Sequence, residues 1–316
     1  MIKLENISKT YKIGTFGGKD LHAVRNVSFD VADGQVVSLI GESGSGKSTI
    51  GKMILGLIPI TDGLITADDL DISTLKGNTL KDYHEKVQGV FQDPFSSYNP
   101  IYKADRVFET IKDEFYPDMS EKEWAKKVND CLEAVGLNPE IVLNKFPHQL
   151  SGGQLQRLLI ARALILDIEF LVADEIISML DASTRVDVLN LLADLKSLGL
   201  SILFITHDLS LGYYISDNSV ILYQGRITEM GSTEKIYKDP LHPYTKMLMA
   251  SVPRLDKKWE EVDIELKGKS AELDHGCVYY ERCPLAYDKC QQEPPMVEID
   301  DNHHVACWKV QQQMKA

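Results

Sequence analysis

A glycine-rich stretch near the start of the chain has the residue types and spacing of a phosphate-binding loop. Residues 41–48 read GESGSGKS and fit G-x-x-x-x-G-K-[ST]. Glycine permits turns that point successive N–H groups inward, and a following helix adds its positive N-terminal end. We expect Lys47 to reach the β- and γ-phosphates and Ser48 to ligate Mg²⁺. The residues predicted to hold the nucleotide are Gly41, Ser43, Gly44, Ser45, Gly46, Lys47, Ser48 and Thr49.

Two carboxylates and a histidine end two further apolar stretches. EFLVADE closes on Asp174 and Glu175, and SILFITHD contains His207. Acids at the end of a buried parallel strand lie at the carboxyl edge of the sheet, where open α/β sheets bind ligands. We expect Asp174 to hold Mg²⁺, Glu175 to polarise the attacking water, and His207 to donate to the γ-phosphate.

LSGGQ at residues 150–154 is a second helix start suited to an anion. Ser151 stands at an N-cap position, and Gly152 and Gly153 expose backbone N–H groups beside it. The residues that follow, LQRLLIARALILD, repeat apolar side chains along one helical face. This pattern predicts a helix whose tip can face a phosphate.

The elements that must position these residues alternate short apolar strands with helices, which indicates an α/β fold. The stretch 103–165 has few Gly and Pro residues and is predicted to be mostly helical. The tail beyond residue 232 is richer in Pro and Cys and lacks regular periodicity. We expect a helix from residue 47 to about 57 and strands at 2–8, 21–31, 35–40, 170–175 and 201–208.

Composition limits the classes of partner. The chain has 316 residues, 44% of them hydrophobic, enough for two domains or for one domain with an appendage. Its net charge of −13 disfavours a nucleic acid partner. MIKLENISKT has no apolar core of an export signal, and no apolar run approaches the roughly 20 residues of a membrane span. We therefore expect an intracellular protein, soluble or held at a membrane by a partner.

The order of the motifs carries a family resemblance. A phosphate loop, then LSGGQ, then a strand ending in Asp-Glu resembles the nucleotide-binding subunits of ABC transporters over residues 1–235. NKFP at 144–147 lacks the aspartate of a guanine-reading motif, which counts against GTP. The resemblance implies an α/β P-loop NTPase with an antiparallel β subdomain and a helical subdomain at about 95–165. It also implies that Ser151, Gly152, Gly153 and Gln154 close over ATP held by a second subunit.

Further positions match the family one at a time. Tyr11 stands where an aromatic residue stacks on adenine. Gln92, in GVFQDPFSSYNP, matches a glutamine that senses the γ-phosphate, ligates Mg²⁺ and lies in a loop contacting the membrane partner. Asp181, in SMLD, matches a loop that runs between the two subunits.

The sequence departs from the usual family pattern in three places. Ile176-Ile177 replace a common Pro-Thr, Met179 replaces an Ala, and Leu155 replaces a basic residue. Both carboxylates are intact, so we expect hydrolysis of ATP to ADP and phosphate. Loss of the proline frees one φ angle beside Glu175, which leaves the geometry of that loop open.

VFQDPFSSYNP and DPLHPYTKMLMASVP resemble the oligopeptide/dipeptide branch of importers, whose relatives also import nickel chelates and oligosaccharides. The branch implies a peripheral motor at the cytoplasmic face of the cell membrane. Its expected partners are a second ATP-binding subunit, sister or self, two integral membrane permeases and an extracytoplasmic solute-binding protein. A soluble ATPase that senses redox state or iron is the alternative from another class.

The tail at 236–316 carries four grouped cysteines, with spacing C-x₅-C-x₆-C-x₁₆-C. Four thiolates can hold zinc or an iron–sulfur cluster, and the spacing is looser than that of zinc ribbons. Within the resembled branch the same pattern implies a [4Fe–4S] cluster on Cys277, Cys283, Cys290 and Cys307, with zinc second. Cys131 lies in the helical region and is expected to be an ordinary buried residue.

Overall fold

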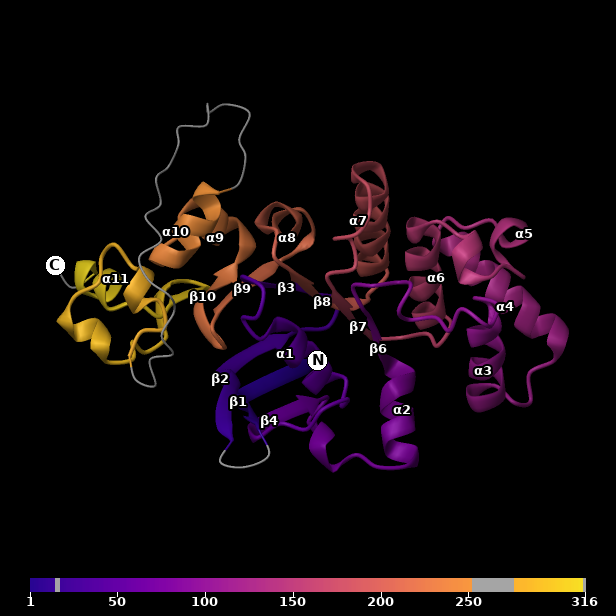
Figure 1. Ribbon diagram of the computed structural model, residues 1–316, viewed down its shortest axis with the longest axis horizontal. Helices are drawn as coiled ribbons and strands as arrows, with labels where there is room; N and C mark the ends of the chain where they lie inside the picture. Colours follow the sequence, from indigo (N-terminus) through magenta and orange to yellow (C-terminus); the bar gives the residue numbers. More distant parts are fainter. Residues whose placement is uncertain (15–17, 252–275, 315–316) are drawn as a thin grey trace.

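The computed structural model describes residues 1–14, 18–251 and 276–314 and shows two sheets with helices around them (Figure 1). The smaller sheet is antiparallel. Its strands, in spatial order, are β2 (Lys19–Val31), β1 (Ile2–Ile13), β4 (Asp62–Ala67) and β5 (Leu70–Asp71).

The larger sheet is mixed. Neighbouring strands from β9 to β6 are parallel, and those from β11 to β9 are antiparallel. In spatial order its strands are β11 (Val297–Asp300), β12 (His303–Val305), β10 (Arg226–Ser232), β9 (Asn218–Tyr223), β3 (Val36–Ile40), β8 (Ser201–Thr206), β7 (Phe170–Asp174) and β6 (Val87–Val90).

Helices surround the larger sheet, and one lies between the two sheets. Figure 1 shows α1 between the sheets, α7 to α10 on the opposite side, and α3 to α6 gathered beyond β6. The helices are α1 (Lys47–Ile54), α2 (Asn78–Lys86), α3 (Arg106–Phe115), α4 (Glu121–Ala134), α5 (Pro139–Val142), α6 (Gly152–Leu164), α7 (Ala182–Ser197), α8 (Leu209–Ile215), α9 (Thr233–Lys238), α10 (Pro243–Ala250) and α11 (Trp308–Gln313). The predicted α/β class, the strands and the helical stretch are confirmed.

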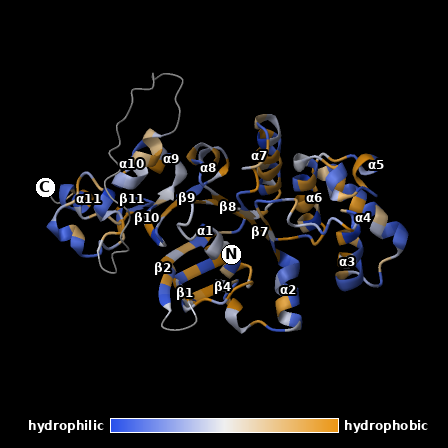
Figure 2. Ribbon diagram, in the orientation of Figure 1, coloured by the Kyte–Doolittle hydropathy of each residue, from blue (hydrophilic) through white to orange (hydrophobic). Residues whose placement is uncertain are grey.

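Hydrophobic patterning explains why these segments take these forms. β3, β7 and β8 are mostly apolar and buried along their whole length, as expected of central strands covered on both faces. β1 and β2 instead alternate buried and exposed residues, visible as alternating colours in Figure 2. One core fills the space between the sheets around α1, and a second joins α4, α6 and α7 to the larger sheet.

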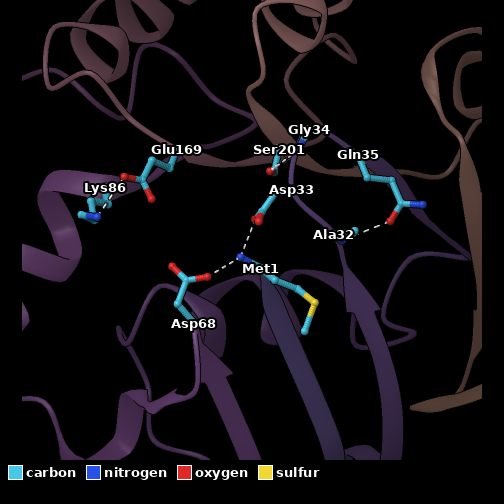
Figure 3. Close-up of polar contacts among 9 residues, drawn as sticks. All are labelled: Met1, Ala32, Asp33, Gly34, Gln35, Asp68, Lys86, Glu169 and Ser201. Carbon is cyan, nitrogen blue, oxygen red and sulfur yellow. Dashed lines mark hydrogen bonds and ion pairs between the residues drawn. The ribbon is translucent and has the colours of Figure 1, made fainter.

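Polar contacts join the two sheets at the amino edge of the larger one (Figure 3). The amino group of Met1 pairs with Asp33, in the turn before β3, and with Asp68, in the turn before β5. The Gly34 N–H donates to the Ser201 hydroxyl at 2.9 Å, which ties that turn to the start of β8. These contacts hold the end of the sheet opposite the phosphate loop, so their role is structural.

The tail continues the larger sheet, which its irregular sequence does not predict. β12 pairs with β10 through Glu229↔Val305 and Gly231↔His303, and β11 pairs with β12. Glu229 is fully buried, and its carboxylate accepts from the Leu241 N–H, the His242 N–H and the ring of His303 at 2.7–2.9 Å. A buried carboxylate with that many donors fixes the position of the tail against β10.

Among the described residues, every helix is too short or too polar to span a membrane.

His242 gives the fold a pH dependence of known sign. It caps α10 by accepting from the Tyr244 N–H at 3.0 Å, and burial lowers its pKa to about 4. The unfolded chain takes up a proton near pH 6.5 while the folded chain does not, so stability is complete above pH 6.5 and is lost as pH falls toward 4. The loss from this group is about 3 kcal/mol.

We expect the His242→Asn variant to lose the pH dependence of stability that His242 contributes, because asparagine also caps a helix but does not titrate. Urea unfolding at steps between pH 4 and 6.5 should give a shallower pH slope than in the wild type. His148→Asn, at an exposed histidine, should keep the wild-type slope. Equal slopes in all three proteins would contradict the prediction.

Candidate functional site

The phosphate loop connects the carboxyl end of β3 to α1, as its pattern predicts. Gly44 and Gly46 have φ angles of +79° and +103°, in the region that favours glycine. A Cβ added at Gly41 would lie 2.1 Å from the Leu222 carbonyl oxygen. The loop therefore passes too close to β9 for any larger residue, and its tight curve leaves the start of α1 facing the enclosed space.

Lys47 extends its side chain back across this loop and is 4% exposed. Its ammonium donates to the carbonyls of Gly41 and Glu42 at 2.8 and 3.0 Å, and lies 3.9 Å from Glu175 Oε1. Burial lowers the pKa of Lys47, and the neighbouring carboxylates oppose that shift. An ammonium held mostly by carbonyl oxygens can exchange them for phosphate oxygens, with which it makes stronger, charge-assisted hydrogen bonds.

Three other groups fit a Mg²⁺-bound phosphate. The Ser48 hydroxyl donates to Asp174 Oδ1 at 3.1 Å, across 126 residues of sequence. Burial raises the pKa of Asp174, and a bound cation would favour its charged form. The Ser45 hydroxyl is buried without a hydrogen-bond partner among the described residues, so it is free to donate to a phosphate oxygen.

Glu175 lies beside these groups in a strained conformation. Its φ is +50°, uncommon for a residue other than glycine. The strain is held in place because the Glu175 N–H donates to Ile205 at 2.9 Å and its carbonyl accepts from the Ser178 N–H and hydroxyl. Glu175 Oε2 lies 3.4 Å from His207 Nδ1, and the His207 side chain is 58% exposed. The carboxylate is thus placed between Lys47 and an accessible imidazole.

The isoleucines that follow Glu175 anchor the same turn. Ile176 and Ile177 are 1% and 2% exposed and belong to the core beneath α6 and α7. Their packing fixes the loop where the family commonly has proline. The other departures are equally accommodated, because Leu155 is fully buried in that core and Met179 is 60% exposed.

Gln92 and Tyr11 are positioned by strands of different sheets. Gln92 follows β6 by two residues, and the parallel pairing Val90↔Ala173 makes β6 and β7 leave the sheet at one edge. Tyr11 lies on β1, is 37% exposed and pairs with Leu21 on β2, close to where β2 contacts the loop. Ser43 lies within the loop, and Thr49 lies in α1.

The LSGGQ residues form the expected helix tip. Ser151 Oγ accepts from the Gln154 N–H, and Gln154 Oε1 accepts from the Ser151 N–H, which is a complete capping box. Asp181 caps α7 by accepting from the Thr184 N–H and hydroxyl, and hydrogen bonds from Ser183 and Thr184 lower the pKa of Asp181. A Cβ at Gly153 would lie 2.7 Å from the Thr184 side chain, so the two helix starts adjoin.

This helix tip does not join the residues predicted at the phosphate loop. The phosphate loop, Asp174, Glu175 and His207 share hydrogen bonds and ion pairs, whereas α6 lies well apart from α1 in Figure 1. Within one chain the phosphate loop and the LSGGQ tip are therefore separate.

The prediction from sequence missed one group at the loop. The Glu42 carboxylate accepts from Arg282, from the tail, at 2.9 and 3.1 Å. No short sequence pattern around Arg282 indicates a contact with the phosphate loop.

The four tail cysteines line one small cavity beside α10. Burial raises the pKa of Cys283 and Cys307, and that of Cys277 to about 12. Within the part of the chain that the structure describes, no group of three or more His, Cys, Asp or Glu side chains is arranged to hold a metal ion. The thiols thus share a cavity without forming a ligand shell.

Comparisons with known proteins agree with this geometry. Residues 24–178 match the ABC transporter family, and residues 228–290 match the oligopeptide/dipeptide transporter C-terminal region. The solved dimeric, post-hydrolysis structure of the ATP-binding cassette MJ0796 bound to ADP and Pi is 31% identical with a TM-score of 0.67. That likeness covers 74% of this chain and 99% of MJ0796.

Two curated relatives match over nearly the whole chain. The probable peptide ABC transporter ATP-binding protein of Sinorhizobium fredii is 37% identical over 97% of this chain and 89% of its own length. The oligopeptide transport ATP-binding protein OppF of Salmonella typhimurium is 38% identical over 92% of this chain and 89% of its own length. The chain therefore belongs to the ABC transporter family, as an ATP-hydrolysing ATP-binding subunit that carries the oligopeptide/dipeptide transporter C-terminal region.

Proposed function

We propose that this chain works in a pair, each ATP being completed by the LSGGQ tip of the opposite subunit. The observation that carries the proposal is the separation of α6 from α1 within one chain. At the tip, the N–H groups of Gly152 and Gly153 lie outside the capping box of Ser151 and Gln154 and can face an anion from another subunit. The MJ0796 cassette, similar in fold, is dimeric in its solved structure.

Within each phosphate loop the residues have separable roles. Lys47 contacts the β- and γ-phosphates, and the N–H groups of the loop surround them. Ser48, Gln92 and Asp174 would hold Mg²⁺, which would offset phosphate charge. Glu175 accepts the proton of the attacking water, and the exposed His207 beside it donates to the γ-phosphate.

We propose peptide import as the process that this hydrolysis drives. The relatives' names and the tail region point to peptides. The loop after Gln92 exposes Phe95 (49%), Ile101 (75%) and Tyr102 (45%), an apolar surface suited to a membrane subunit. The complete assembly would contain a second ATP-binding subunit, two permeases and an extracytoplasmic solute-binding protein, with this chain peripheral at the cytoplasmic face.

We further propose that the four tail cysteines bind a [4Fe–4S] cluster, with zinc as the second choice. The support for this proposal is the cavity that the four cysteines share. Burial raises the thiol pKa values, so a metal would have to deprotonate the thiols as it binds. Binding would draw the sulfurs together and brace a tail with little core of its own.

Glu175→Gln tests the proposed base. It should lower ATP turnover by about 100-fold or more while ATP binding persists, because the loop and Lys47 are unchanged. Phosphate release and nucleotide binding are measured on the same preparation. Glu169→Gln makes the same change at an exposed carboxylate on the amino edge that pairs with Lys86, and should leave turnover intact. Near-wild-type turnover in Glu175→Gln would exclude Glu175 as the base.

Gly152→Asp tests the pairing and the importer together. A Cβ at Gly152 meets nothing closer than Phe95 at 3.9 Å, so the new carboxylate is tolerated by the fold and repels phosphate at the tip. Tagged wild-type and variant chains should both co-purify with integral membrane proteins. The variant complex should lose hydrolysis and its stimulation by a peptide-loaded solute-binding protein, while the isolated variant chain binds ATP normally.

Asn78→Asp adds the same charge at the first residue of α2 and should leave hydrolysis unchanged. Weaker ATP binding by the isolated Gly152→Asp chain would contradict the pairing. Absence of integral membrane proteins from the wild-type preparation would contradict the importer and favour a soluble ATPase.

Metal content tests the cysteine proposal. Protein purified without oxygen should contain iron and acid-labile sulfide in equal amounts, and Cys290→Ser should lose both. Cys131→Ser changes the cysteine outside the group and should keep them. Zinc without sulfide would favour a zinc site. Absence of both iron and zinc would refute the proposal.

A further inference from the structure

Glu42, the second residue of the phosphate loop, is hydrogen-bonded to the C-terminal part of the chain. The Glu42 N–H donates to Tyr244 Oη of α10 at 3.0 Å. The Glu42 carboxylate accepts from Arg282 Nη1 at 3.1 and 2.9 Å, across 240 residues of sequence. Backbone and side chain of one loop residue are thus both fixed by elements that follow the ATP-binding fold.

Arg282 is itself held in place by packing. Its guanidinium donates to Tyr223 Oη at 3.3 Å and lies 5.7 Å from the ring centroids of Tyr223 and Tyr279. These two rings and that of Tyr244 pack with centroids 4.6–5.4 Å apart, in a core that includes Ile40 at the end of β3. The Arg282 side chain is 18% exposed. Its geometry is therefore set before any nucleotide arrives.

The contact bears directly on phosphate binding. A carboxylate at the start of the loop opposes a polyanion, and Arg282 both neutralises it and holds it to one side. The Glu42 carbonyl is also one of the two that hold the Lys47 ammonium. Glu42 therefore links the tail to Lys47. Its carboxylate accepts from Arg282, and its backbone carbonyl accepts from the Lys47 ammonium.

We propose that Arg282 is a positioning residue for ATP, acting through Glu42 to set the charge and shape of the phosphate loop. Arg282 does not touch the nucleotide. The segment that carries the four cysteines thereby contributes to ATP affinity, a role separate from that of the LSGGQ tip.

Four variants of the full chain test the proposal, with ATP affinity measured by equilibrium binding and KM and kcat by hydrolysis. Arg282→Ala leaves Glu42 unpaired and should weaken ATP binding and raise KM by about three- to tenfold at low salt, with kcat nearly unchanged. Arg282→Lys keeps the positive charge without the planar guanidinium, so its ATP affinity should lie between those of wild type and Arg282→Ala. Glu42→Gln removes the repelling charge and should bind at least as tightly as wild type.

The double variant Arg282→Ala with Glu42→Gln should recover the affinity lost in Arg282→Ala, which a purely structural role for Arg282 would not allow. Glu42→Asp covers the case in which Arg282→Ala does not fold. It keeps the charge on a side chain too short for the contact and should weaken binding while leaving the tail intact.

Lys289→Ala is the matched control, because it removes a cation from the same segment. The Lys289 ammonium lies over the ring of Trp308, 3.9 Å from its centroid, and not at the phosphate loop. It should bind ATP like wild type. Wild-type affinity in both Arg282→Ala and Glu42→Asp, or no recovery in the double variant, would overturn the proposal.

Discussion

The desolvated ammonium of Lys47 is the charge around which this site is arranged. A buried ammonium without partners is costly, and here two loop carbonyls and the carboxylates of Asp174 and Glu175 offset that cost. The carbonyls reach the Lys47 ammonium because the loop curves tightly. The carboxylates reach it because β8 pairs with both β3 and β7, so β7 ends near the loop that follows β3. Loop, sheet order and acidic strand end are therefore parts of one electrostatic arrangement.

The strain at Glu175 belongs to the same arrangement. A φ of +50° turns its carboxylate toward Lys47 and His207. The buried side chains of Ile176 and Ile177 supply the anchoring that keeps this conformation. Hydrophobic packing therefore anchors the turn that follows Glu175.

Much of this site was predictable from sequence because its parts are local. Spacing within GESGSGKS sets the loop, Ser151 and Gln154 cap their own helix, and an apolar run ending in Asp174 puts acids at a sheet edge. The contact of Arg282 with Glu42 and the pairing of β12 with β10 were not predictable. Both join distant segments, and they depend on how the tail packs rather than on any short pattern.

The tail strands also decide what the larger sheet offers to other molecules. Without β12, the backbone donors and acceptors along β10 would be open to pairing with a foreign strand. β12 and β11 occupy that place, and the outermost strand carries Glu298 and Asp300 as exposed acids. Charges of this kind discourage further strand addition. The tail that contacts the phosphate loop through Arg282 thus also limits association through the larger sheet.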